Sequence, residues 1–227
     1  MVSPWMKHGN VMQCISHLLK QKEKVPYYRW IYEIASGMQY LFHEDVVHGD
    51  LRGANILVDD KLSIQIADFG LSRVLDPDSA KEVSIQSGAV RWFAPEIVLH
   101  SAKASSRTEV YAFGCVCLEI FTRKIPFCTK CEYQVSAGMS NHQPPYSSLK
   151  ALPAFLRRHI ADCISFKSSK CPNIDAIVDL LQHVPYQLQG TANAPSVALS
   201  RVDVTAPQSS PQVPRSAATL IRDIFHL

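Results

Sequence analysis

Apolar side chains recur at helical spacing through most of the chain, and this pattern predicts a mainly helical protein. A first helix is expected after Asn10, which is suited to be its N-cap. A second is expected from Pro26 to about His43, because a proline at the first helical position sacrifices no hydrogen bond. The positions expected to be buried in these two helices are Val11, Cys14, Ile15, Leu18, Leu19, Ile31, Ile34, Ala35, Met38 and Leu41.

Residues 110–121 are apolar on nearly every side, which is typical of a helix buried at the centre of a domain. Residues 155–166 and 173–183 each carry one apolar face and predict two amphipathic helices. Shorter helices are expected over 97–100 and around 132–139. The second half of the chain is therefore expected to pack as helices around a central one.

Short β-strands are expected at 56–58 and 62–67, on either side of a turn at Asp59-Asp60-Lys61. The expected fold class is therefore α+β, mainly α-helical, with small β-hairpins. Residues 76–87 are polar and predict a long irregular loop. From Pro185 the composition shifts to Pro, Ser, Ala, Gln and Val, so we expect one domain over 1–183 and a disordered Pro/Ser-rich tail over 184–227.

Composition narrows the class of protein. Of the 227 residues 47% are apolar, enough for a sizeable core, and the net charge is only +3. The sequence has no basic cluster of the kind that grips nucleic acid, no apolar run of membrane-spanning length, and no signal peptide at its start. The seven cysteines are scattered, and Cys128-x-x-Cys131 has no second pair at zinc-site spacing, so we expect reduced thiols. These features predict a soluble cytoplasmic protein with no nucleic-acid or membrane partner.

Candidate chemistry concentrates in one stretch that leads into the first expected strand. Asp50, Arg52 and Asn55 place an acid, a cation and an amide in one short loop. A solvated turn has no need of three different polar chemistries, so we interpret this loop as a site. Two further short motifs follow in order, Asp68-Phe69-Gly70 after the hairpin and Ala94-Pro95-Glu96 after the polar loop.

Taken together, these segments resemble the C-terminal lobe of a eukaryotic protein kinase domain, and the likeness is to the tyrosine-kinase-like group. The residues that carry it are "VVHGDLRGANILVD", "IADFGLSR", "RWFAPE" and "VYAFGCVCLEIFT", and the resemblance covers residues 1 to 183. It implies ATP-dependent phosphoryl transfer to Ser, Thr or Tyr of a protein substrate. Such transfer asks the protein mainly for positioning and for compensation of charge.

The resemblance assigns roles to the polar residues of the loop and of the second motif. Asp50 would accept or orient the proton of the substrate hydroxyl, and Arg52 would offset charge on the transferred phosphoryl group. Asn55 and Asp68 would hold Mg²⁺, which prefers oxygen ligands of this kind.

The resemblance also assigns residues to the nucleotide and to the interior. Leu57 would lie under the adenine ring of ATP, and the backbone of Met6 would offer hydrogen bonds to that ring. His48 and Phe69 would stack on each other as part of an internal apolar spine.

The chain begins at what resembles the kinase hinge, so we expect the N-terminal lobe to be absent and the isolated chain to be inactive. Four residues also depart from the usual kinase pattern. Gly49 and Cys171 stand where the family usually has arginine, and Ala89 stands where many members have threonine. Glu109 replaces an aspartate that braces the catalytic loop in the family. Two alternatives to an active kinase stay open. One is a non-catalytic pseudokinase or interaction module that meets a protein substrate or a partner kinase, and the other is a truncated gene product.

Overall fold

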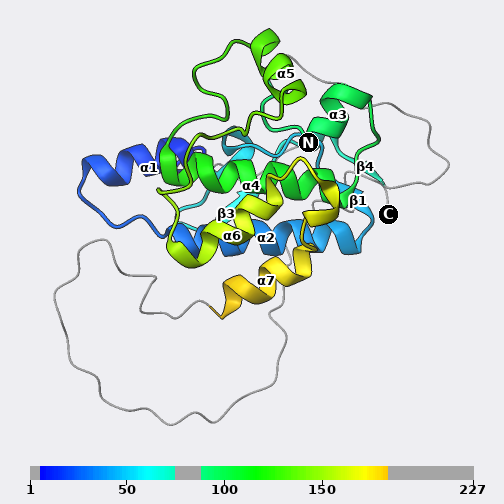
Figure 1. Cartoon of the computed structure of the whole chain (residues 1–227). Coiled ribbons are helices and arrows are strands. Elements are labelled where there is room, and N and C mark those ends of the chain that lie inside the picture. Colours follow the sequence, from blue (N-terminus) through cyan, green and yellow to red (C-terminus); the bar gives the residue numbers. More distant parts are fainter. Residues whose placement is uncertain (1–5, 75–87, 184–227) are drawn as a thin grey trace.

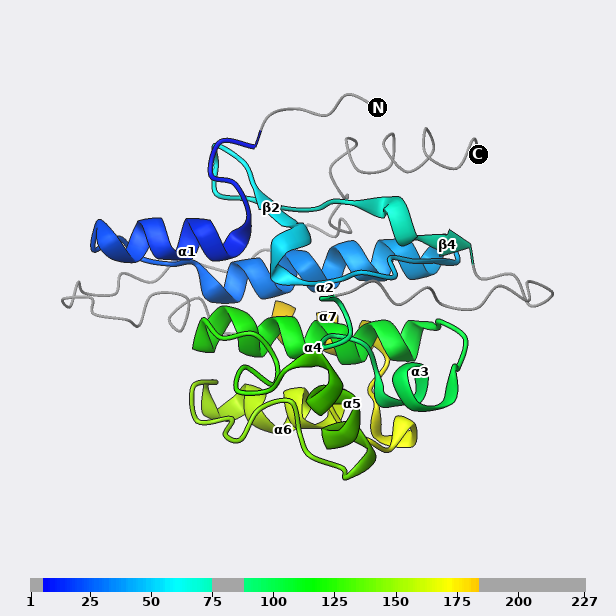
Figure 2. The same ribbon diagram turned by 90° about the horizontal axis from the view of Figure 1, so that it is seen from above.

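The structure is a computed structural model, and it describes residues 6–74 and 88–183. Figure 1 shows a mainly helical body, and Figure 2 shows α2 and α4 side by side through its middle, with the strands on one side and α3, α5 and α6 on the other. The expected polar loop at 76–87 and the expected tail at 184–227 lie outside the described residues. The helices are α1 (Val11–Lys20), α2 (Tyr27–His43), α3 (Pro95–His100), α4 (Ser106–Thr122), α5 (Glu132–Ser140), α6 (Ala154–Cys163) and α7 (Ile174–Gln182).

The first two helices begin where their sequence signals place them. Asn10 caps α1 through its side chain, which accepts the N–H of Gln13 at 2.9 Å, while the Gln13 side chain accepts the N–H of Asn10 at 3.0 Å. Nine of the ten positions expected to be buried in α1 and α2 are buried. Leu19 is the error: it is 40% exposed, because the next residue after Leu18 turns by about 100° away from the core.

Helix α4 is the buried centre of the domain, as its apolar sequence predicts. It begins at Ser106, earlier than expected, because Ser105 and Thr108 form a capping box there. A Cβ on Gly114 would lie only 2.7 Å from Ile164 Cγ2, so the glycine allows α6 to pack closely on α4. Two carboxylates, Glu109 and Glu119, are also buried in this helix, and the apolar pattern did not predict them.

Two small antiparallel sheets complete the described part of the chain. Strands β2 (Ile56–Val58) and β3 (Ile64–Ile66) pair as expected, with Ile56 opposite Ile66. Strands β1 (Val46–Val47) and β4 (Arg73–Val74) also pair, and this second pair joins segments that no local sequence signal connects. The α+β, mainly helical class is therefore confirmed.

The cysteines and the helix lengths can be compared with what the sequence predicts. All seven cysteines are free thiols. Within 6–74 and 88–183, none of the helices has the length and apolar character needed to cross a membrane.

Gly49 shows why the residue before Asp50 is a glycine. Its φ of +81° lies in the left-handed region, and a Cβ at this position would meet the carbonyl oxygen of Leu71 at 2.6 Å. We expect Gly49→Ala to lower the free energy of unfolding by about 1–3 kcal/mol, measured by chemical denaturation. Gly70→Ala is the control, because its nearest contact, at 3.3 Å, is to the terminal oxygen of the exposed Asp68 side chain, which can move, and its φ is not left-handed. Equal stability of the two variants would contradict the strain argument.

Candidate active site

The loop between β1 and β2 brings the three predicted polar side chains together around Asp50. The Asp50 side chain is buried at 6% exposure, and its Oδ2 accepts the Asn55 amide at 2.8 Å. The same oxygen lies 3.2 Å from Nε of Arg52. Burial raises the pKa of Asp50, while the Arg52 charge and the Asn55 hydrogen bond oppose that rise. The result is a carboxylate that is held in place and more basic than an exposed one.

His48 secures the start of this loop from inside the protein. Its ring Nδ1 accepts the N–H of Asp50 at 3.2 Å, so Nε2 carries the hydrogen and donates it to the Ala67 carbonyl at 2.9 Å. Burial lowers the pKa of His48, which keeps the ring neutral and consistent with this tautomer. The ring also packs against Phe69 with 5.0 Å between centroids, so the two rings are in contact as expected, but they are tilted by 59° and not stacked.

The β2–β3 hairpin brings Asn55 close to Asp68. Asn55 directly precedes β2, and its carbonyl accepts the N–H of Ala67, the residue before Asp68. Both hydrogen bonds from the Asn55 amide nitrogen go to Asp50, one to the carboxylate and one to the carbonyl oxygen at 2.9 Å. The amide oxygen is therefore the end of Asn55 that remains for a ligand.

Asp68 supplies the second oxygen donor. It is exposed, and its backbone is left-handed with φ of 64°, a conformation that non-glycine residues adopt mainly where surrounding structure enforces it. An amide oxygen and an exposed carboxylate suit Mg²⁺, which keeps several waters as its remaining ligands. In the described ranges, no cluster of three or more His, Cys, Asp or Glu forms an alternative metal site.

The residues predicted to meet adenine lie beside this hairpin. Leu57 is half-buried in β2, and it forms an isolated antiparallel bridge with Asn10. The segment that begins at Met6 runs along β2, because His8 donates to the Val58 carbonyl at 3.3 Å. The Met6 carbonyl accepts the N–H of Gly9 at 3.1 Å. The structure thus places Met6 and Leu57 on adjoining segments, and their contact with a nucleotide stays a prediction.

Glu109 stands where the resemblance places an aspartate, and its side chain is one methylene longer. This longer side chain reaches the loop. It is 5% exposed, and its two carboxylate oxygens accept the N–H groups of His48 and Gly49 at 3.2 and 3.0 Å. Burial raises the pKa of Glu109 to about 7, against these two hydrogen bonds. The longer side chain therefore braces the first half of the loop from α4.

Glu119 braces the second half of the loop, and sequence reasoning missed it. Its Oε2 accepts the N–H of Gly53 at 3.1 Å and the indole N–H of Trp92 at 2.9 Å. Burial raises the pKa of Glu119, and these two donors with the Arg52 charge oppose the rise. A carboxylate in an otherwise apolar helix was the available signal, because such a group needs buried donors.

The motif around Pro95 is tied to the rest of the site by Arg91 and Trp92. Arg91 donates to the carbonyls of Phe127 and Lys130 at 2.8 and 2.6 Å, which fixes the segment that leads into α5. Glu96 is half-buried, and its charge together with burial raises the pKa of Cys171 to about 11. The charge of Glu96 therefore acts on Cys171, at the position where the resemblance places an arginine.

Comparison with known proteins agrees with this geometry. Residues 1–181 match the family described as protein tyrosine and serine/threonine kinase. Human serine/threonine-protein kinase A-Raf is 30% identical over 181 residues, which are 75% of this chain and 30% of A-Raf. Mitogen-activated protein kinase kinase kinase dlk-1 of Caenorhabditis briggsae is 32% identical over 148 residues, 65% of this chain and 17% of that protein. Serine/threonine-protein kinase STE11 of Saccharomyces cerevisiae is 40% identical over 98 residues, 42% of this chain and 13% of that kinase.

The chain thus spans 30% or less of the length of each of these three relatives. The expected likeness to the tyrosine-kinase-like group is confirmed by the kinases it resembles. On the match over residues 1–181, this chain belongs to the protein tyrosine and serine/threonine kinase family.

Proposed function

We propose that this chain carries the acceptor and metal side of a protein kinase active site, for ATP-dependent phosphoryl transfer to a Ser, Thr or Tyr hydroxyl of a protein. One observation carries the proposal. Asn55 commits both amide hydrogen bonds to Asp50 and leaves its oxygen for a ligand, close to the exposed carboxylate of Asp68, which lies two residues beyond the paired strand β3.

Each residue has a chemical task in this proposal. Asp50 accepts the hydroxyl proton of the substrate, and its burial makes it a better base. Arg52, held 3.2 Å from Asp50, offsets charge on the transferred group. ATP bound with Mg²⁺ supplies the phosphoryl group, Asn55 and Asp68 hold the metal, and Leu57 and Met6 meet the adenine.

We also propose that the chain by itself transfers no measurable phosphate. Asp68 is exposed in this structure, so water has free access to the metal side of the site. Open access weakens every electrostatic contact that transfer depends on. Phosphorylation of the purified chain by radiolabelled ATP, abolished by Asp50→Asn, would contradict this part of the proposal.

A non-catalytic interaction module is the second candidate. Cys171 beside Glu96 favours it, because a neutral thiol cannot form the ion pair that the resemblance places there. In that case the protein would work by binding a protein partner within the cell, and its function would survive Asp50→Asn.

Metal binding tests the proposed site directly. We expect Mn²⁺, a spectroscopic substitute for Mg²⁺, to bind the chain weakly and saturably in an electron paramagnetic resonance titration. Asp68→Asn should weaken binding at least about 10-fold, because it removes the charged ligand. Asp60→Asn is the control, since that acid is exposed in the turn of the same hairpin. Equal Mn²⁺ affinity in the wild type and Asp68→Asn would refute the assignment of Asp68.

A further inference from the structure

Two adjoining pockets lie on the far side of α4 from the candidate active site. The first, of about 410 Å³, lies between α3 and α5. The second, of about 580 Å³, lies between the segment that precedes α6 and the segment that follows it. Both volumes fall within the range of about 300–1,000 Å³ that is usual for ligand sites. His142 and Phe166 line both pockets, so the two form one continuous groove with an aromatic wall inside it.

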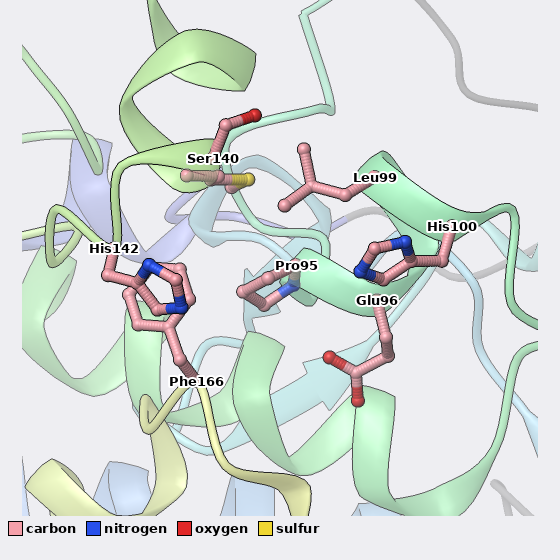
Figure 3. Close-up of a pocket in the computed structure, with 8 residues that line it drawn as sticks. Pro95, Glu96, Leu99, His100, Ser140, His142 and Phe166 are labelled. Atoms are coloured by element: carbon pink, nitrogen blue, oxygen red, sulfur yellow. The ribbon is translucent and has the colours of Figure 1, made fainter.

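The wall of the groove is held in an uncommon conformation. His142 has a left-handed φ of 54°, and its ring packs on Phe166 with 5.3 Å between centroids. Figure 3 shows these two rings on one side of the first pocket and Leu99 on the other, with Pro95 between them. This conformation closes the end of α5, because the N–H of His142 donates to the Met139 carbonyl and the N–H of Gln143 donates to the Gly138 carbonyl, both at 2.9 Å.

The groove continues onto an exposed face of α5. Tyr133, Ala137 and Ser140 are all exposed and follow one another at helical spacing, so they share one face. Ser140 lines the first pocket, and Tyr133 is 84% exposed, which is unusual for so large a ring. One exposed aromatic side chain on a helix face that ends in a pocket is typical of a surface that meets another protein.

The charged side chains around the groove indicate which kind of partner it would bind. Lys167 and Lys170 line the second pocket and are exposed, and His100 and His142 line the first. Among the described residues that line either pocket, Glu96 is the one acid. Its side chain points away from Leu99 and Ser140 in Figure 3, and its charge acts on Cys171. Lys167 and Lys170 therefore give the rim of the second pocket a positive charge.

We propose that this groove binds an acidic protein segment with two apolar side chains, one placed in each pocket. An extended segment fits because its alternate side chains point to the same side, and the His142–Phe166 wall would separate them. Acidic residues that flank the apolar pair complement Lys167 and Lys170. None of the residues proposed to meet ATP, Mg²⁺ or the substrate hydroxyl lines this groove.

Peptide binding to the full chain tests the proposal. The probe is a fluorescein-labelled peptide, Glu-Asp-Leu-Asp-Phe-Glu-Asp, and the comparison peptide, Lys-Arg-Leu-Lys-Phe-Arg-Lys, reverses every charge. We expect fluorescence anisotropy to show saturable binding of the acidic probe, at least about 10-fold tighter than that of the basic one, and weaker in high salt. The double variant Lys167→Glu, Lys170→Glu should lose about 10-fold in affinity.

Two further variants separate the groove from general charge and from folding. Lys20→Glu, Lys22→Glu changes the same charge at the exposed end of α1 and should leave affinity within about 2-fold. Ser140→Trp should fill the first pocket and weaken binding about 5-fold with no change in thermal unfolding, because Ser140 is exposed. No binding of the acidic probe below about 1 mM, equal binding of the two peptides, or equal losses in both lysine pairs would overturn the proposal. Binding of phosphatidylserine vesicles in place of the peptide would also overturn it.

Discussion

Glu109→Ala is expected to lower the free energy of unfolding by about 2–5 kcal/mol. The carboxylate is the acceptor for the backbone N–H groups of His48 and Gly49, at 3.2 and 3.0 Å, inside the protein. The substitution leaves both donors buried and opens a cavity beside them. Each buried donor without a partner costs about 1–3 kcal/mol, so two of them account for the size of the effect.

Urea denaturation followed by far-UV circular dichroism measures this change. Glu44→Ala is the control, because Glu44 is an exposed acid and its loss should alter stability by less than about 0.5 kcal/mol. A Glu109→Ala variant as stable as Glu44→Ala would show that Glu109 does not brace the loop.

The same residue should give the protein a pH-dependent stability. Burial raises the pKa of Glu109 from 4.5 to about 7, so the folded state holds this proton more tightly than the unfolded chain. The contribution is therefore complete below pH 4.5 and is lost as the pH rises through about 7. Between about pH 5 and about pH 8, the wild type should lose about 1–3 kcal/mol relative to Glu109→Gln, which has no proton to release. Parallel stability profiles for the two proteins would contradict the raised pKa.

Glu119→Ala is expected to cost about 2–4 kcal/mol of folding free energy and to loosen the second half of the loop. Its carboxylate accepts from Gly53 in the loop and from the Trp92 indole, and it lies close enough to Arg52 for their charges to interact. Removal would therefore release two segments from the acceptor that they share. Glu119→Gln keeps an oxygen acceptor in the same place and should restore most of the stability.

A double-mutant cycle with Trp92→Phe isolates the indole contact. Phenylalanine keeps most of the ring but has no N–H, so the coupling with Glu119→Ala should be about 0.5–3 kcal/mol. Free energies that add with no coupling would show that the contact between Trp92 and Glu119 contributes nothing to folding.

Several features followed from the sequence because their causes are local. The caps of α1 and the start of α2 depend on side chains within a few positions of the helix ends. The burial of α4 follows from its own apolar composition, and the hairpin that brings Asn55 close to Asp68 follows from one turn. Leu19 shows the limit, because an apolar residue at the edge of a helical face is buried only if a neighbour covers it.

Other features needed contacts between distant segments. The pairing of Val46 with Val74 joins two strands whose own sequences do not indicate that they pair. In the sequence, Glu119 is only a charged residue in an apolar helix. The folded structure shows that its carboxylate accepts hydrogen bonds from Gly53 and Trp92. The groove at His142 and Phe166 likewise exists only where α3, α5 and the segment after α6 converge.

The sequence by itself determined the kinase family, the main helices and the polar residues of the loop between β1 and β2, because residue types and short spacings carry that information. The tertiary structure alone decided how the loop is held. Buried carboxylates gain their partners only when α4 passes beneath the loop, and the donors come from residues far along the chain. It also decided that Asn55 turns its amide nitrogen to Asp50, which leaves the amide oxygen for the proposed metal.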